Sequence, residues 1–381
     1  MISVSRLLCG LRATGDPLRY ERSGDVRPVV VWNVTRKCNL RCIHCYASAE
    51  NVKYPGELTT EQALSVIDDL AGFGAPVVLF SGGEPLLRGD LFTLAEHASK
   101  KGIRCVLSTN ATLIDGETAQ RLKSAGFAYI GVSIDGVGEE HDRIRGKAGS
   151  FDEAIQGLRN CRQQGLRTGL RFTINRLNRL QLPAIFELVE REDIPRLCIY
   201  HLVLTGRGDR MERFEMSHEE TREAMDFIFE QVRKFDERGL EKEILTVDNH
   251  TDGVYLYLTL REENADRAEE VYRLLQRSGG NRSGIAIACI DNLGNVHADQ
   301  FSWHHSFGNV LSKPFSQIWQ DGTDPAMAIL RNRKSHLKGR CGVCRFLDIC
   351  NGNLRARAYA NTGDWLAPDP GCYLPEAVTG L

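Results

Sequence analysis

The sequence has no long apolar run and almost no excess of charge of either sign. No apolar segment approaches the roughly 20 residues that a membrane-spanning helix needs. Residues 1–16 lack both a sustained apolar stretch and a small-residue cleavage site, so they do not form a signal peptide. The 48 basic and 50 acidic residues leave a net charge of −2, which gives no support to a nucleic-acid or membrane-surface binder. We therefore expect a cytoplasmic protein.

Cysteine is the residue type whose placement stands out in an otherwise ordinary globular composition. A length of 381 residues allows two or three domains, or one large barrel with an added module. The twelve cysteines are not expected to form disulfides, because the cytoplasm keeps thiols reduced. Three of them fall within residues 38–45 and three within 341–350. This clustering indicates metal ligation rather than scattered core thiols.

Short apolar runs alternate with helical patterns through the first half of the chain. The runs predict strands at Val29–Asn33, Pro76–Phe80, Arg104–Ser108, Tyr129–Ile134, Leu170–Asn175 and Leu197–Val203. Alternating strands and helices imply an α/β fold with a parallel sheet and right-handed crossovers. Six units are too few for a full eight-unit barrel, so we expect a partial (β/α)6 barrel. Its functional loops should follow the carboxyl ends of the strands.

Changes in residue composition and hydrophobic pattern divide the chain into four predicted parts. Residues 1–27 form an N-terminal extension and 28–205 the partial barrel. Residues 206–284 are charged and helical in pattern, and we interpret them as a bridge. Residues 285–381 change to short strands and turns and contain the second group of cysteines, so they are predicted to form a C-terminal module.

The first group of cysteines stands in a loop that follows the first predicted strand. Cys38, Cys42 and Cys45 can ligate three irons of a [4Fe–4S] cube, and with no fourth cysteine nearby one iron keeps an open position. An open iron indicates a catalytic cluster rather than one that only carries electrons. A zinc site is one alternative, although this is not a zinc-finger spacing. Coincidental packing of buried thiols is the other.

The spacing Cys-x3-Cys-x2-Cys after a first strand resembles the signature of the radical S-adenosylmethionine (SAM) superfamily. In that family the open iron binds the amino and carboxylate groups of SAM. The reduced cluster then splits SAM into methionine and a 5′-deoxyadenosyl radical. The resemblance implies an enzyme of oxidoreductase or lyase type, with a SAM-binding [4Fe–4S] cluster and Cys38, Cys42 and Cys45 at its catalytic centre.

The resemblance also implies which residues contact SAM. The implied set is His44, Gly82, Gly83, Glu84, Ser108, Asn110, Ser133, Asp135, Arg145 and Arg171. His44 would lie near the adenine, and the Gly-Gly-Glu turn would offer carbonyls and a carboxylate to the methionine ammonium, with glycines letting the backbone approach the ligand. Arg145 ends the element His-Asp-x-x-Arg and would bind the SAM carboxylate. A plain turn and a solvated surface arginine are the alternatives.

The second group of cysteines has enough thiols to close a metal site. Its members are Cys341, Cys344, Cys350 and Cys372. Their pattern resembles the SPASM module of radical SAM enzymes, which implies an auxiliary [4Fe–4S] cluster. Structural zinc is the alternative. We expect one auxiliary cluster and not two, because Cys289 alone remains in the hairpin region and 351–361 contains no cysteine.

Long stretches, among them PVVVWNVTRKCNLRCIHCYA and GRCGVCRFLDICNGNLRARA, resemble the radical SAM enzymes of haem d1 biosynthesis. The resemblance implies a tetrapyrrole substrate, 12,18-didecarboxysirohaem, from which propionate side chains are removed, in a pathway that serves denitrification. It also implies an electron donor such as ferredoxin or flavodoxin. Three alternatives stay open: a related enzyme that forms haem b, a peptide-modifying SPASM enzyme, and a non-catalytic iron–sulfur carrier.

A tetrapyrrole with several carboxylates needs cationic partners, and its iron can take a histidine. The candidates for the carboxylates are Arg207, Arg210 and Arg213, at the start of the bridge. The histidines that could reach the iron or the carboxylates are His250, His297, His304 and His305. For each of these residues an ordinary packed or surface position is the alternative.

Overall fold

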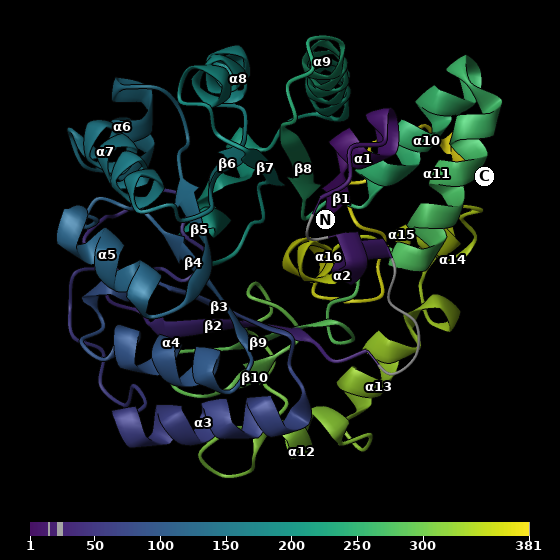
Figure 1. The fold of residues 1–381 in the computed structure, drawn as a ribbon. Coiled ribbons are helices and arrows are strands. Elements are labelled where there is room, and N and C mark those ends of the chain that lie inside the picture. The colour runs from purple at the N-terminus through teal and green to yellow at the C-terminus, as the bar shows by residue number, and fades with distance from the viewer. Residues whose placement is uncertain (14–15, 21–25, 381) are drawn as a thin grey trace.

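The computed structural model describes residues 1–13, 16–20 and 26–380 and contains one ten-stranded sheet. Six parallel strands form its centre: β2 (Val29–Thr35), β3 (Val77–Gly82), β4 (Arg104–Thr109), β5 (Phe127–Ser133), β6 (Thr168–Ile174) and β7 (Arg196–His201). They lie in sequence order along an arc (Figure 1). All six strands were predicted from the apolar runs, and the parallel α/β sheet is confirmed.

The helices that follow these strands cover the outer face of the arc (Figure 1). They are α3 (Thr60–Phe73), α4 (Leu91–Lys100), α5 (Gly116–Ser124), α6 (Glu139–Arg145), α7 (Ser150–Gln163) and α8 (Leu182–Arg191). In α3 the side chain of Thr59 accepts a hydrogen bond from the backbone of Gln62 in a capping box, and Gly74 ends the helix in the left-handed conformation. A threonine before an apolar helical pattern and a glycine after it are the sequence signals of such a start and stop. The short helix α6 is bounded by glycines.

The segment predicted to be a helical bridge adds a strand to the sheet. Its helices are confirmed: η3 (Gly206–Phe214), α9 (His218–Glu237), α10 (Thr251–Glu263) and α11 (Ala265–Ser278). Between them β8 (Glu243–Val247), buried along its whole length, pairs in parallel with β7. The N-terminal β1 (Ile2–Ser3) then pairs antiparallel with β8. The prediction of helices alone was wrong here, because five residues between charged helices carry too little pattern to identify a strand.

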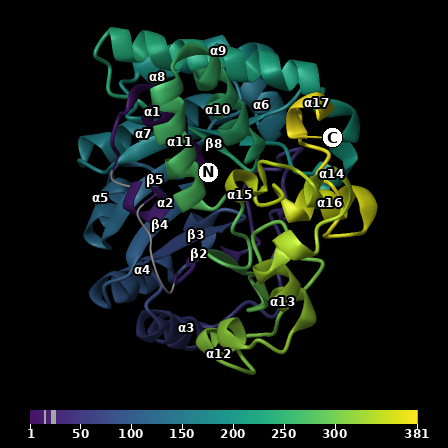
Figure 2. The same cartoon turned by 90° about the vertical axis from the view of Figure 1, so that its right-hand side faces the viewer.

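The C-terminal segment extends the other edge of the same sheet. There β9 (Ile287–Ile290) pairs in parallel with β2, and β10 (Val296–His297) pairs antiparallel with β9. The helices of this segment are α12 (Phe315–Gln320), α13 (Pro325–Arg331), α14 (Gly339–Gly342), α15 (Leu347–Cys350), α16 (Arg355–Thr362) and α17 (Glu376–Thr379). Among them α15 packs on α10 and α11 (Figure 2). The four predicted parts therefore share one sheet.

The remaining elements are short. They are α1 (Val4–Cys9), α2 (Asp16–Tyr20), η1 (Pro85–Leu87), η2 (Arg179–Gln181) and η4 (Arg333–Ser335). The core beneath the sheet is aromatic in part: Phe80 contacts Trp32 and Phe127, with ring centroids 6.2 and 5.7 Å apart. No helix in the described part of the chain is both long and apolar enough to cross a membrane.

Candidate active site

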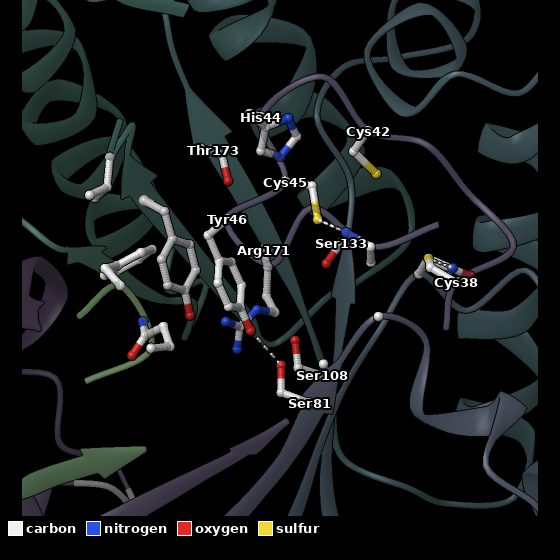
Figure 3. Close-up of a pocket in the computed structure, with 18 of the residues that line it drawn as sticks. Cys38, Cys42, His44, Cys45, Tyr46, Ser81, Ser108, Ser133, Arg171 and Thr173 are labelled. Carbon is white, nitrogen blue, oxygen red and sulfur yellow. Dashed lines mark hydrogen bonds between the residues drawn. The ribbon is translucent and has the colours of Figure 1, made fainter. Parts of the chain in front are cut away.

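One cavity lies at the carboxyl ends of the parallel strands, where functional loops were expected. Its wall includes all three cysteines of the first group, together with the strand ends at Ser81, Ser108, Ser133, Thr173 and Tyr200. Figure 3 shows Arg171 and Tyr46 among these side chains. Of the ten residues implied as SAM contacts, eight line this cavity, and Glu84 and Asp135 are the two that do not.

The cysteine loop is held in place by backbone hydrogen bonds to elements distant in sequence. The backbone N–H of Ile43 donates to the carbonyl of Ile144 (3.0 Å), and that of Cys38 to the carbonyl of Glu50 (3.0 Å). Arg207 donates from Nε to the carbonyl of Cys42 (2.9 Å) and from Nη1 to that of Ala49 (2.8 Å). These hydrogen bonds tie the cysteine loop to α6 and to the segment after β7.

Burial makes two thiols of this loop, Cys38 and Cys42, poor acids. It raises the pKa of Cys38 to about 12 and raises that of Cys42 as well, although Arg145, 3.6 Å from the Cys42 sulfur, opposes the rise at Cys42. A thiolate at these positions therefore needs a metal cation to stabilise it. This donor set fits an iron–sulfur cluster that ligates through thiolates.

Gly82 and Gly83 are required for close packing of two loops. A Cβ on Gly82 would lie 2.1 Å from the carbonyl oxygen of Thr35, and one on Gly83 would lie 2.2 Å from that of Lys37. At the same place the backbone N–H of Gly83 donates to Thr35 and that of Glu84 to Lys37, both at 2.8 Å. The sequence argument explained the glycines by approach to a ligand. The structure gives a more immediate reason, which is that the loop after β3 touches the loop after β2.

Glu84 is buried behind the cavity wall and accepts hydrogen bonds from residues that form it. It has no exposed surface, and its carboxylate accepts hydrogen bonds from Thr109 Oγ1 (2.8 Å), the backbone of Asn110 (2.8 Å) and the backbone of Leu86 (3.2 Å). Burial raises the pKa of Glu84 to about 7, although these hydrogen bonds oppose the rise. The carboxylate therefore holds the end of β4 against the turn after β3, and contact between Glu84 and SAM stays a prediction.

Asp135 is buried beside the cavity and pairs with two residues that line it, Arg145 and His44. Its Oδ2 lies 2.6 Å from Arg145 Nη2 and 3.2 Å from His44 Nε2, and its Oδ1 accepts from the backbone of Thr173 (2.8 Å). Burial opposes ionisation, yet Arg145 and His44 keep the pKa of Asp135 well below its usual range. Arg143, the other arginine of the His-Asp-x-x-Arg element, is exposed and pairs with Glu140. Arg145 is therefore the arginine of this element that faces the cavity.

Arg171 is a cation of the cavity wall that has no ion pair among the described residues. Its guanidinium lies 4.6 Å from the ring centroid of Tyr200, and the pair stands on the adjacent strands β6 and β7. A partly buried guanidinium without a carboxylate partner is suited to binding an anionic ligand.

The second group of cysteines also surrounds a single cavity. Cys341, Cys344, Cys350 and Cys372 all line a small cavity of about 20 Å³ beside α10. Cys289 is elsewhere: it lies in β9, where its sulfur accepts a hydrogen bond from Asn33 Nδ2 (3.5 Å). Burial raises the pKa of Cys341, Cys344 and Cys350, and Arg355 opposes the rise at Cys341 and Cys350.

Throughout the described residues, no three His, Cys, Asp or Glu side chains converge as the ligands of one metal ion do.

Most of the substrate contacts suggested by the sequence have other partners. Arg207 binds loop carbonyls, although its Nη2 is buried without a partner, and Arg210 and Arg213 are exposed. His297 bonds through both ring nitrogens to the carbonyl of His305 and to Asp291. His250, His297, His304 and His305 do not line the cavity that Cys38, Cys42 and Cys45 share.

The structure adds cavity residues that the sequence argument missed. Tyr200 and His201 end β7, Asp248 follows β8, and Phe301 comes from the loop after β10. The Oδ2 of Asp248 is buried without a hydrogen-bond partner among the described residues, and burial raises its pKa to about 6. The signal that could have found Tyr200 and His201 is their position at the end of a predicted strand. Asp248 required the strand β8 to be recognised first.

The fold and the site together define an α/β protein with a cysteine loop and a set of polar groups at the carboxyl ends of its parallel strands. The sequence model of the Radical SAM superfamily matches residues 32–189. A solved structure of native anSMEcpe with bound AdoMet has a TM-score of 0.70 at 18% identity and covers 91% of this chain and 94% of that chain. The chain belongs to the radical SAM superfamily, whose fold carries a [4Fe–4S] cluster and SAM.

Two relatives match almost the whole chain. Fe-coproporphyrin III synthase of Methanosarcina barkeri is 52% identical, over 100% of this chain and 99% of the relative. Pre-heme d1 synthase of Dinoroseobacter shibae is 43% identical, over 96% of this chain and 90% of the relative. Both names describe the synthesis of a tetrapyrrole, as the haem-related resemblance of the sequence implied.

Proposed function

We propose that this enzyme removes carboxylate side chains from an iron tetrapyrrole, 12,18-didecarboxysirohaem. The single observation that carries the proposal is the pair of relatives, 52% and 43% identical over nearly the whole chain, that are named for tetrapyrrole products. The cavity supports it, because Arg171 offers a guanidinium with no ion pair among the described residues beside the aromatic ring of Tyr200. Such a pair suits a flat macrocycle that carries carboxylates.

The residues on the cysteine side of the cavity would hold the cluster and SAM. Cys38, Cys42 and Cys45 would ligate three irons, and Arg145 would bind the SAM carboxylate while Asp135 fixes its position (2.6 Å). The strand ends Ser108 and Ser133 line the same wall and supply hydroxyl groups. When bound, the cluster and SAM supply a 5′-deoxyadenosyl radical. A radical is needed because no side-chain base removes hydrogen from an unactivated side-chain carbon.

The opposite wall would receive the tetrapyrrole. It is built by the ends of β6, β7 and β8 and by the loop after β10, which contribute Arg171, Tyr200, Asp248 and Phe301. Arg171 would bind a substrate carboxylate, and the two aromatic rings would pack on the macrocycle. Arg207 also reaches this cavity, and its unpartnered Nη2 could bind a second carboxylate.

The second set of cysteines would hold an auxiliary [4Fe–4S] cluster. The support is that all four thiols line one small cavity and that Cys289 lies apart from them. With four thiolates no iron keeps an open position, so such a cluster would carry electrons or stabilise the module rather than bind SAM. A small protein such as ferredoxin or flavodoxin would supply the electrons. The four-part division of the chain likewise remains our proposal.

Two products are compatible with this substrate. We rank them by the sequence identity between this chain and the relative named for each product. If the product is Fe-coproporphyrin III, the enzyme removes the two acetate side chains and leaves the propionates. The higher identity, 52% over the complete chain, favours this product. If the product is the haem d1 precursor, it removes propionates, as the resemblance of the sequence first suggested; the 43% identity to a pre-heme d1 synthase supports this second candidate.

An anaerobic assay decides between these products. The reconstituted enzyme is mixed with didecarboxysirohaem, SAM and a reductant, and the tetrapyrroles are identified by mass spectrometry. Loss of acetates supports the first product and loss of propionates the second. An unchanged tetrapyrrole, under conditions in which SAM is cleaved, would refute the proposed substrate. A Cys42→Ala variant is the control for chemistry that does not depend on the cluster.

A further inference from the structure

His201 lies where two cavities meet. It ends β7 and lines the cavity of the cysteine loop, and it also lines a neighbouring cavity of about 250 Å³ bordered by Asn249, Arg357 and Gly371. Leu202 is the other residue that both cavities share. A group bound beside His201 would therefore touch the reaction cavity and have room on its other side.

One ring nitrogen of His201 is held by a buried carboxylate. Its Nε2 lies 2.9 Å from Asp252 Oδ2, and Asp252 has no exposed surface. The other oxygen of Asp252, Oδ1, accepts a hydrogen bond from the hydroxyl of Tyr373 (2.9 Å), which is 1% exposed. Both carboxylate oxygens are thus engaged. A carboxylate beside Nε2 favours the tautomer that carries the proton on Nε2 and leaves the lone pair on Nδ1.

The remaining nitrogen, Nδ1 of His201, receives no hydrogen bond from any residue in the described ranges. An imidazole whose N–H is directed at a buried carboxylate, and whose other nitrogen is left open, is the usual arrangement of a histidine that ligates a metal. The carboxylate sets the tautomer and the ring orientation and makes the open nitrogen a stronger donor. Imidazole is also a common axial ligand of iron in a tetrapyrrole.

The other histidine of the cavity wall, His44, has a similar pairing: its Nε2 lies 3.2 Å from Asp135, and its buried Nδ1 has no partner among the described residues. His44 differs in its position, because it stands between Cys42 and Cys45 in the cysteine loop and therefore on the side proposed for SAM. His304 stacks on Tyr359, with ring centroids 3.7 Å apart, and lies outside both cavities.

We propose that His201 is the axial ligand of the substrate's iron, bound through Nδ1, and that Asp252 is the residue that positions it. The proposal rests on the function proposed above, since it requires an iron tetrapyrrole in this cavity. Ligation at His201 places the macrocycle between the neighbouring cavity and the SAM side. It fixes which side chains of the substrate face the radical.

The test compares iron-containing and metal-free coproporphyrin III as ligands of the reconstituted holoenzyme. His201→Ala should weaken binding of the ferric porphyrin by about tenfold or more and leave binding of the metal-free porphyrin unchanged. Asp252→Asn keeps the ligand and should weaken iron-specific binding by roughly 10-fold. His336→Ala removes an exposed histidine that lines neither cavity and should change neither affinity.

Electron paramagnetic resonance gives an independent readout, because oxidised [4Fe–4S] clusters are silent and ferric porphyrin is not. Wild type should show nitrogen-ligated ferric iron that is lost in His201→Ala and restored by added imidazole. Retention of that signal in His201→Ala, or equal weakening of both porphyrins, would overturn the assignment of His201. Failure of wild type to bind either porphyrin would instead count against the proposed function.

Discussion

Arg145 and Asp135 form a buried ion pair of 2.6 Å that joins α6 to the end of β5. Asp135 is fully buried and Arg145 is 8% exposed, so the guanidinium reaches the cavity only at its edge. Arg143 and Arg145 are both candidates by sequence, but only Arg145 pairs with Asp135. The pair fixes the Arg145 guanidinium beside the cysteine loop. The first prediction follows from this arrangement.

Arg145→Ala should weaken SAM binding and retain iron. Loss of a charge-assisted contact is worth about 1.5–3 kcal/mol, or roughly one to two decades of affinity. The variant also removes the arginine partner of the buried Asp135, leaving His44 and the backbone of Thr173 as its partners, and should lower the free energy of unfolding by up to about 3–5 kcal/mol. SAM binding and iron content of the anaerobic protein measure the first effect. Arg143→Ala is the matched control, because Arg143 is on the same helix and its side chain is 59% exposed; equal effects of the two variants would contradict the assignment.

Gly83→Ala should destabilise the protein and impair assembly of the first cluster. Its Cβ would meet the carbonyl oxygen of Lys37 at 2.2 Å, and the backbone beside Cys38 would have to move. Such overpacking costs typically about 1–3 kcal/mol. Thermal unfolding and iron analysis provide the measurement. Gly72→Ala is the control, since nothing lies within 4 Å of its Cβ, and it should be neutral or stabilising; a normal iron content in Gly83→Ala would count against the packing argument.

Glu84 should make stability depend on pH in a defined window. Its pKa is raised from 4.5 to about 7 in the folded chain, so the folded state binds the proton more tightly than the unfolded state. The stabilisation is fully present below about pH 4.5 and is lost as the pH rises to about 7. The free energy of unfolding of wild type, measured with urea, should therefore fall over this pH range relative to that of Glu84→Gln, whose side chain at position 84 does not titrate. Parallel profiles for the two proteins would show that Glu84 is not the titrating group.

The number of irons tests the second set of cysteines. Two cubes give about eight irons per chain, and Cys341→Ala with Cys344→Ala should reduce this to about four while SAM cleavage remains measurable. Turnover of the tetrapyrrole should fall. Cys289→Ala is the matched control and should leave the iron content unchanged, because Cys289 lies in β9 away from the other four. About twelve irons in wild type, or zinc at this site, would disprove the single auxiliary cluster.

Sequence patterns predicted the elements that local periodicity determines and missed those that depend on distant partners. The six apolar runs became β2 to β7, and the capping signal at Thr59 began α3. The strand β8 is apolar over too short a length to stand out, and it is recognisable only by its pairing with β7.

The same limit applies within the site. The cysteines and Arg145 could be found because their spacing is local, and the structure brings them to one cavity. The pairing of His201 with Asp252 spans 51 residues and has no local signal. Arg207 was expected to face substrate; it lines the cavity and also donates hydrogen bonds to the carbonyls of Cys42 and Ala49, contacts across 165 and 158 residues that have no local signal.

The central claim is that radical chemistry begins on a side chain of a tetrapyrrole bound in this cavity. Its most direct test uses didecarboxysirohaem labelled with deuterium on its side-chain methylene groups, incubated anaerobically with the reconstituted enzyme, SAM and a reductant. Our account predicts deuterium in the 5′-deoxyadenosine, measured by mass spectrometry, and formation of 5′-deoxyadenosine that depends on the tetrapyrrole. Unlabelled 5′-deoxyadenosine, formed at the same rate with and without the tetrapyrrole, would contradict it.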